Sequence, residues 1–229
     1  MTQRKWGLAA LIVAIGACAF AAADGDKPAD TPGVVVDKDK RTITIDAKVS
    51  PRKFSDPRYM RADGTPYPLE VVACWPFEKP HQQKAHETAY TVECQPSDVA
   101  KAVESFGLKP GTPQNGGENY PDGPEVNIFV EAPTDSGDMK RYPIEKTMID
   151  PKTGKSLGKQ RWHFTGSALV QPDPNKVEKV FGADTTGTLI CVFPVTDLTV
   201  FQAHQKFTDQ HVVDLEIDKK LLPKEGTPV

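Results

Sequence analysis

The sequence predicts an α+β fold that is mainly β: an antiparallel sheet or sandwich of short strands with one packed helix. Glycine and proline punctuate the chain, with 17 and 21 of its 229 residues, and proline use is well above the average of about 5%. Short apolar runs are separated by turn sequences, as in strands. Helical periodicity is clear in only one segment, residues 97–106. This pattern excludes a helical bundle or a long coiled coil.

The first ordered elements form a predicted hairpin. Residues 34–36 are a short apolar run, and a charged turn follows at 37–40. Residues 42–49 then alternate strictly between polar and apolar side chains, which is the signature of a half-buried strand. One face of this strand carries Ile43, Ile45, Ala47 and Val49. We therefore expect 42–49 to be the second arm of the hairpin.

Further short strands are predicted after a long loop at residues 50–68, which is rich in proline and basic residues. The last segment, 212–229, alternates only weakly. The expected strands lie within residues 69–75, 88–93, 126–130, 161–164 and 188–193.

The one predicted helix has recognisable ends. Ser97 is a suitable N-cap and Asp98 places a negative charge in the first turn, where the helix dipole favours it. Gly107 is a typical stop. The apolar stripe expected to face the sheet is Val99, Ala102, Val103 and Phe106.

The N-terminus predicts export. Arg4 and Lys5 precede an apolar run of 11 residues, 6–16, which is shorter than the roughly 20 residues that span a bilayer. Small residues follow, as in a secretory signal peptide. We expect a leader at 1–23, cleaved before Asp24.

A second cleavage position also fits. Residues 15–18, Ile-Gly-Ala-Cys, resemble a bacterial lipoprotein box. In that case the leader is 1–17 and Cys18 carries the lipid. Both possibilities give an exported protein that is periplasmic, envelope-attached or secreted, and no later stretch is apolar and long enough to span a membrane.

The rest of the chain reads as one domain. Residues 24–33 form a polar linker with two prolines and two glycines. Residues 34–229 are long enough for a single core, with a C-terminal extension from about residue 202. The formal charge of −3 speaks against a nucleic-acid partner, because phosphate binding needs a basic face.

Three cysteines remain after Cys18: Cys74, Cys94 and Cys191. An odd number in an exported protein means one disulfide and one thiol, or three buried thiols. Cys74 and Cys94 flank a connection almost symmetrically. In an antiparallel hairpin centred near residue 84 they would face each other, which makes a disulfide between them a candidate.

His86 and Glu87 are the candidate binding or metal residues. Imidazole ligates metals and moves protons near neutral pH, and an adjacent carboxylate assists. If both residues lay in a strand, their side chains would point to opposite faces. A metal or thiol site would combine His86 with Cys74 and Cys94. The alternative is a loop-to-strand junction whose polar groups bond to the backbone.

Other residues carry weaker signals. Ser167 lacks an identifiable base, so a turn is expected there rather than a nucleophile. His163 is expected to point outward, and His204 and His211 to lie on the surface. Residues 154–156, Gly-Lys-Ser, imitate the end of a phosphate-binding loop, but Ile149 occupies the position of its first glycine.

Several segments together resemble the YdjY domain, a family of exported bacterial proteins of unknown function. The resemblance rests on the hairpin at 36–45 and on Pro-Leu-Glu-Val at 68–71. It also includes Lys-Ala-His-Glu-Thr at 84–88 and Phe-Gly-Leu-Lys-Pro-Gly at 106–111. Further matching segments are Pro-Ser-Asp-Val at 96–99, Trp-His-Phe-Thr-Gly-Ser at 162–167, and 183–190. The resemblance implies a fold and an exported location, and no reaction.

These observations favour an exported, non-enzymatic module that binds a ligand or an envelope or extracellular partner, without a cofactor. The alternative function is a metal- or thiol-dependent redox protein using Cys74, Cys94 and His86.

Overall fold

The structure is a computed structural model that describes residues 11–15, 32–79, 84–211 and 214–229. The first strands are β1 (Leu11–Ile15), β2 (Val34–Asp37), β3 (Thr42–Ile45), β4 (Ala47–Val49), β5 (Val71–Cys74), β6 (Thr88–Val92), β7 (Glu125–Pro133) and β8 (Met139–Pro143). They are followed by β9 (Met148–Asp150), β10 (Lys155–Ser156), β11 (Trp162–Phe164), β12 (Leu169–Val170), β13 (Val180–Phe181), β14 (Thr188–Cys191), β15 (Phe201–Ala203) and β16 (Glu216–Ile217).

Helices are fewer in the described part of the chain. The α-helices are α1 (Pro96–Glu104) and α2 (Ala183–Thr186). Short 3-10 helices are η1 (Pro57–Tyr59), η2 (Ala85–Glu87), η3 (Ile144–Thr147) and η4 (Phe207–His211). The mainly β prediction with one substantial packed helix is therefore confirmed.

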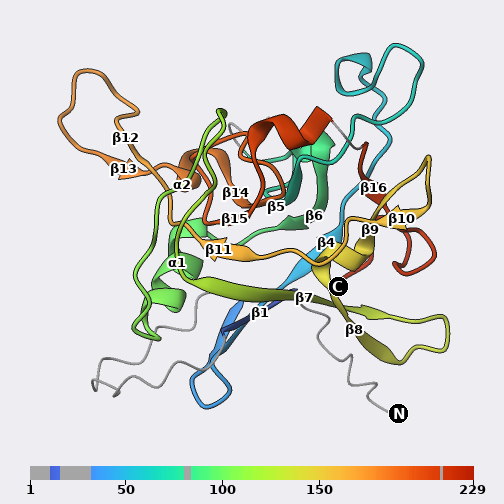
Figure 1. The fold of residues 1–229 in the computed structure, drawn as a ribbon, viewed down its shortest axis with the longest axis horizontal. Coiled ribbons are helices and arrows are strands. Elements are labelled where there is room, and N and C mark those ends of the chain that lie inside the picture. Colours follow the sequence, from blue (N-terminus) through green and yellow to red (C-terminus); the bar gives the residue numbers. More distant parts are fainter. Residues whose placement is uncertain (1–10, 16–31, 80–83, 212–213) are drawn as a thin grey trace.

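One large sheet organises the molecule (Figure 1). Its strand order is β2–β3–β1–β7–β11–β15–β14–β5–β6–β4, and β8 pairs with β7 beside this path. The three strands β10, β9 and β16 form a small second sheet, and β12 pairs with β13 in an arm that projects from the body.

The prediction of an antiparallel sheet is wrong in two places. β5 pairs in parallel with β6, and β14 pairs in parallel with β15. Each parallel pair is joined by a crossover connection instead of a tight hairpin, as parallel pairing requires. The large sheet is therefore mixed.

The alternating segment 42–49 links the two ends of this sheet. β3 pairs with β2 near one end, whereas β4 pairs with β6 at the other, and only Asp46 separates β3 from β4. The second half of the expected hairpin arm thus pairs elsewhere, and the sheet is curled. The predicted inner face is confirmed, because Ile43, Ile45, Ala47 and Val49 are all buried.

Helix α1 closes one side of the core. Its predicted apolar stripe is buried, and it contacts β2, β3 and α2. The helix begins at Pro96, one residue before the expected Ser97 cap. The Ser97 amide instead donates to the Asp184 carboxylate of α2 at 2.8 Å. A carboxylate from another element thus satisfies an amide that the helix itself leaves unpaired.

The C-terminal segment belongs to the body of the fold. β15 lies inside the large sheet, and the last residues pair with the outer edge of β4. Val229 donates its amide to Ala47 and Val49 donates to Thr227. The residues from about 202 onward are therefore built into the domain.

Part of the predicted leader is also in the sheet. β1 lies between β3 and β7, antiparallel to both, and Leu11 and Val13 are fully buried. The other residues of 1–31 lie outside the described residues, Cys18 and both cleavage positions among them. In the described residues, no helix has the length and apolar character needed to cross a membrane.

Gly187 is the glycine that the packing of Trp75, just after β5, requires. Gly187 ends α2 in the left-handed region at φ 68°, and its carbonyl accepts from the Trp75 amide. An added Cβ would overlap the Trp75 indole ring. We expect Gly187→Ala to lower the free energy of unfolding by about 2 kcal/mol, because backbone strain and overpacking add.

Urea unfolding monitored by circular dichroism measures this change. The matched control is Gly137→Ala, since Gly137 has φ 86° and open space around its Cα. In the control only the backbone strain acts, so its free energy of unfolding should fall by about 1 kcal/mol. Equal losses in the two variants would contradict the packing argument.

Candidate functional site

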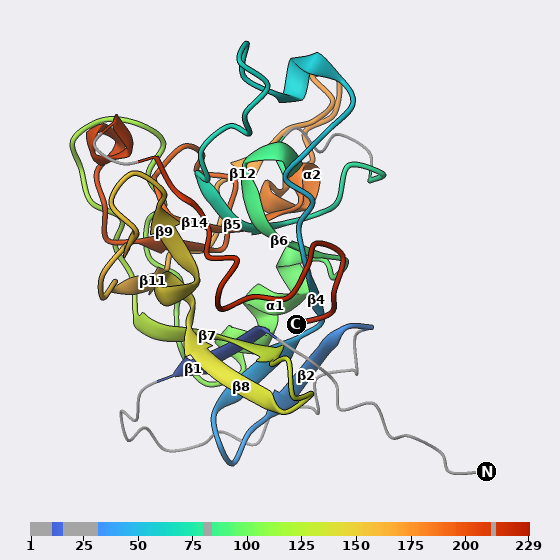
Figure 2. The same ribbon diagram turned by 90° about the vertical axis from the view of Figure 1, so that its right-hand side faces the viewer.

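The candidate site lies where the long loop 50–68 folds over the start of β6. The loop and η1 rise above β5 and β6 in Figure 2. Asp56 caps η1 by accepting from the Arg58 amide, and Pro57 occupies its first position. Proline fits this position because its missing amide would be unpaired anyway. The cap fixes Tyr59, the last residue of η1, over the site.

Aromatic rings from separate segments gather around His86. Phe77 lies with its ring centroid 4.9 Å from that of Phe54 and 4.6 Å from that of Tyr59. The His86 ring is 5.3 Å from Tyr59 and 5.4 Å from Tyr67. These separations are those of favourable aromatic contacts. The imidazole is thus enclosed by carbon-rich rings, and the His86 side chain is only 13% exposed.

The side chains of His86 and Glu87 are in direct contact. Both lie in η2 and not in a strand, so the expectation of opposite faces does not apply. His86 Nε2 is 3.2 Å from Glu87 Oε1. A carboxylate only accepts, so Nε2 carries the proton in this contact. His86 Nδ1 is buried and has no hydrogen-bond partner among the described residues.

Lys84 joins this pair to a second carboxylate. Its Nζ is 2.5 Å from Glu87 Oε2 and 2.9 Å from Glu70 Oε2. The backbone of Glu70 is held on both sides, since its amide donates to Glu87 and its carbonyl accepts from Val192. The result is a partly buried chain of polar contacts in the order Glu70, Lys84, Glu87, His86.

The two carboxyl groups of this chain differ in acidity. Burial raises the pKa of Glu87, but hydrogen bonds from His86 and Lys84 outweigh it and hold the value at about 2. Burial and the neighbouring charge of Glu87 raise the pKa of Glu70, although Lys84 opposes both. Glu87 is therefore firmly ionised, and Glu70 is the carboxyl group that protonates first.

A wide cleft of about 1540 Å³ opens beside the aromatic rings. It runs from β4 and the end of β6 to η1 and to the turn after β5. Phe54, Tyr59, Phe77 and Ala85 form part of its wall, together with prolines 32, 51, 76 and 228. Such concave, mainly apolar surfaces with a few polar groups are typical of ligand sites.

Most charges along the cleft are already paired. Arg58 contacts Asp56 at 2.6 Å and Lys48 contacts Glu93 at 3.7 Å. Lys79 lies over the Trp75 ring at 5.8 Å. The cleft therefore presents aromatic rings and oppositely charged side chains that are paired with each other. It is not the strongly positive surface that a polyanion would need.

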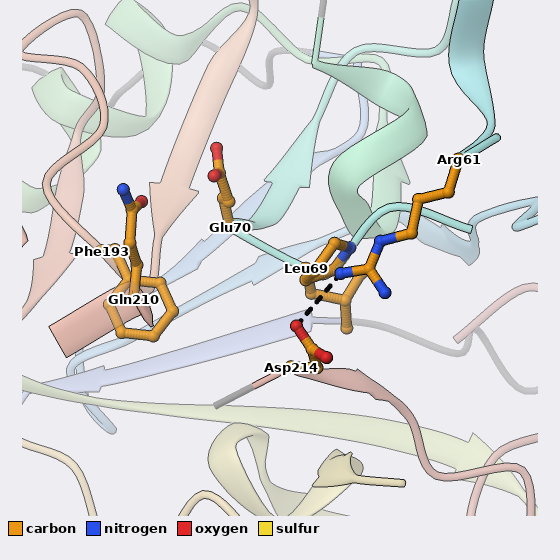
Figure 3. Close-up of a pocket in the computed structure, with 7 residues that line it drawn as sticks. Arg61, Leu69, Glu70, Phe193, Gln210 and Asp214 are labelled. Carbon is orange, nitrogen blue, oxygen red and sulfur yellow. Dashed lines mark hydrogen bonds and ion pairs between the residues drawn. The ribbon is translucent and has the colours of Figure 1, made fainter. Parts of the chain in front are cut away.

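A smaller pocket of about 270 Å³ lies on the other side of Glu70 (Figure 3). An ion pair between Arg61 and Asp214 at 3.1 Å marks one end, and Phe193 and Gln210 mark the other. Figure 3 shows the Glu70 side chain pointing away from that ion pair. Glu70 thus lines this pocket while its carboxylate binds Lys84.

Of the two alternatives for the cysteines, the structure has three buried thiols and not the candidate disulfide between Cys74 and Cys94. β5 and β6 are parallel, so Cys74 lies opposite Thr91, and the hairpin that would bring Cys94 to face Cys74 does not exist. Cys74, Cys94 and Cys191 are all buried thiols. Cys74 instead packs with Cys191 and Ala85 in a small apolar cluster. Burial raises the pKa of each of the three thiols to about 12.

The predicted combination of Cys74, Cys94 and His86 is likewise not assembled. Among the described residues, no group of three histidine, cysteine, aspartate or glutamate side chains is arranged to hold a metal ion. The raised thiol pKa values leave almost no thiolate at neutral pH, and the thiolate is the reactive form.

Ser167 has a structural role. Its hydroxyl accepts from the Ala183 amide at 2.9 Å and donates to the Ala168 carbonyl, at the start of α2. The expectation of a turn residue agrees with this arrangement. The phosphate-loop look-alike at 154–156 is a turn followed by β10.

His163 of β11 differs from expectation. His163 is 4% exposed instead of pointing outward. Its Nδ1 contacts the Gly123 carbonyl, and its Nε2 is 3.1 Å from His204 Nδ1. His204 stacks on Tyr120 with ring centroids 4.3 Å apart. The sequence holds no local signal for this pair, since 41 positions separate its members. The His211 side chain lies outside the described residues.

Comparison with known proteins gives one match. A family model described as the YdjY domain matches residues 34–229. No curated protein and no solved structure matches the chain. The match begins at the first residue of β2 and includes the whole C-terminal segment.

Proposed function

The chain belongs to the YdjY domain family, and we propose that it is an exported member that binds a small ring-containing ligand in the aromatic cleft. The observation that carries this proposal is the wall formed by Phe54, Tyr59 and Phe77 around a cleft of about 1540 Å³. Rings of a ligand gain both apolar burial and favourable edge or face contacts on such a wall.

The surrounding charges indicate the polarity of the ligand. Arg58, Asp56, Lys48 and Glu93 are paired with one another within the protein. A strongly charged ligand would have to break these pairs, whereas an uncharged or zwitterionic one would not. We therefore infer a mainly apolar body with polar groups at its periphery.

The partly buried chain from Glu70 to His86 stabilises the part of the wall that η2 contributes. Its charges satisfy one another, with the Lys84 ammonium shared by two carboxylates. It fixes η2, whose Ala85 lines the cleft and whose His86 packs on Tyr59 and Phe77. We propose a positioning role for this chain and no catalytic one.

Fluorescence titration with the neutral probe N-phenyl-1-naphthylamine tests the proposal. We expect saturable binding at one site, and we expect Phe77→Ala to weaken it at least about tenfold, because the variant removes the ring that contacts both Phe54 and Tyr59. Quenching of Trp75, which packs under the cleft residue Lys79, gives a second readout.

The matched control is Tyr120→Ala. It also removes one ring, but Tyr120 stacks on His204 outside the cleft and is 46% exposed. Its affinity for the probe should equal that of the unchanged protein. Equal affinities of the Phe77 variant and the unchanged protein, or binding that never saturates, would refute a ligand site on this wall.

A further inference from the structure

Strand β1 is the most unusual strand of the sheet. It lies between β3 and β7, with Leu11–Ala14 in register with Thr42–Ile45 and Leu11–Ile15 in register with 126–130. Leu11 and Val13 belong to the main core, and Ile12 on the opposite face is only 5% exposed. β1 is thus a central strand that is buried on both faces.

The same residues are the apolar centre of the predicted leader. Both cleavage positions considered above, before Cys18 and before Asp24, would remove Leu11–Ile15 from the protein. The family match begins only at Val34, so β1 is also outside the part of the chain that defines the domain. In the exported protein that we propose, β1 is therefore only temporarily present between β3 and β7.

β3 is held in place by contacts other than those to β1. It continues through Asp46 into β4, which is fixed by β6 on one edge and by the C-terminal residues on the other. The Asp46 amide also donates to the Gly33 carbonyl, and α1 packs against β2 and β3. Direct pairing of β3 with β7 would require the β2–β3 hairpin to move by a whole strand spacing of about 4.8 Å.

We propose that removal of the leader leaves a slot one strand wide between β3 and β7, and that this slot binds an extended apolar segment of another polypeptide. The strand direction of β1 requires the occupant to run antiparallel to both neighbours. Main-chain hydrogen bonds to both walls supply affinity, as in other cases of β-strand addition. Specificity comes from the positions of Leu11 and Val13, which take apolar side chains into the core.

The proposal depends on leader removal, which is part of the proposed export, but not on the ligand of the aromatic cleft. The test uses protein exported and processed by a bacterial host, and intact mass identifies its N-terminus. A labelled peptide containing Leu-Ile-Val-Ala-Ile between lysine flanks is titrated by fluorescence anisotropy. We expect saturable binding that is at least about tenfold weaker for a peptide with aspartate at the positions of Leu11 and Val13.

Hydrogen exchange provides an independent readout. The amides of β3 and of residues 126–130 in β7 that face β1 should exchange quickly in the processed protein and become protected when the peptide is added. The amides of the same strands that face β2, β8 and β11 should be protected throughout. The full-length chain, made in the cytoplasm so that β1 remains in the slot, is the control and should bind the peptide at least about tenfold more weakly.

Four results would each overturn the proposal. An intact mass that retains residues 11–15 would show that the slot stays filled. Protection of the β1-facing amides of β3 and β7 in the processed protein without peptide would show that the sheet has closed. Dimerisation through these amides would make a second copy the occupant. An unfolded processed chain that the peptide does not restore would show that β1 is an obligatory part of the fold. Binding of N-phenyl-1-naphthylamine to the cleft is measured separately. Failure of the proposed ligand site can therefore be told apart from failure of the proposed peptide site.

Discussion

Replacing Arg52 with alanine should lower the free energy of unfolding by about 3–5 kcal/mol, the usual cost of removing one partner of a buried ion pair. Arg52 is 1% exposed. Its guanidinium contacts the Glu216 carboxylate at 2.8 Å and also donates to the carbonyls of His86 and Tyr67. One side chain thus connects the long loop, η2 and β16. Its removal takes the side-chain donor from two carbonyls and the cation from the Glu216 carboxylate, which then keeps only the hydrogen bond from the Ile217 amide.

Urea unfolding at pH 7 measures this loss, with two controls. Arg141→Ala removes an arginine that contacts Glu131 at 2.7 Å but is 51% exposed, and exposed pairs contribute at most about 1 kcal/mol. Arg52→Lys keeps the charge but lacks the planar fork that reaches three acceptors at once, so its loss should be intermediate. An Arg52→Ala loss no larger than that of Arg141→Ala would contradict the central role of this contact.

Removal of the Lys84 ammonium should have the next largest effect, about 2–4 kcal/mol at pH 7 for Lys84→Met. Lys84 is the cation shared by Glu70 and Glu87. Without it, two carboxylates remain close together and partly buried. Adding Glu70→Gln removes one of the two charges, and the double variant should recover much of the lost stability.

The stability lost in Lys84→Met should depend on pH in a definite direction. Glu87 has a folded pKa of about 2, below its ordinary 4.5, so its contribution is full above pH 4.5 and is lost as the pH falls toward 2. The pKa of Glu70 is raised, and it rises further without Lys84. Glu70 therefore takes up a proton as the pH falls from 7 toward 4.5, and the loss caused by Lys84→Met should shrink over this range. A loss that is constant with pH would show that charge repulsion is not its cause.

Local patterns in the sequence predicted local features well. The alternation of Ile43, Ile45, Ala47 and Val49 identified the buried face, even though β3 and β4 pair at different ends of the sheet. Helix α1 was predicted to within about one turn because its stripe and its glycine stop are local signals.

Features that depend on distant partners were not predictable in this way. The parallel pairing of β5 with β6 follows from a crossover that no local pattern encodes. The candidate pairing of Cys74 with Cys94 assumed an antiparallel hairpin in its place, and the alternative of buried thiols is the one observed. His86 and Glu87 were recognised as a pair, but their contact depends on a 3-10 turn instead of a strand. The rings around His86 come from the long loop 50–68 and from the turn after β5, so only the folded chain brings them together with η2.

The pairing of the last residues with β4 constrains the order of folding. Val229 bonds to Ala47, so a contact that completes one edge of the large sheet spans nearly the whole domain. Contacts this distant along the chain form slowly, because ordering the long intervening chain must come first. In the export that we propose, residues 227–229 would emerge from the membrane well after β4. The edge of β4 would then stay unpaired in the interval, and we expect this edge of the sheet to close only once residues 227–229 have emerged.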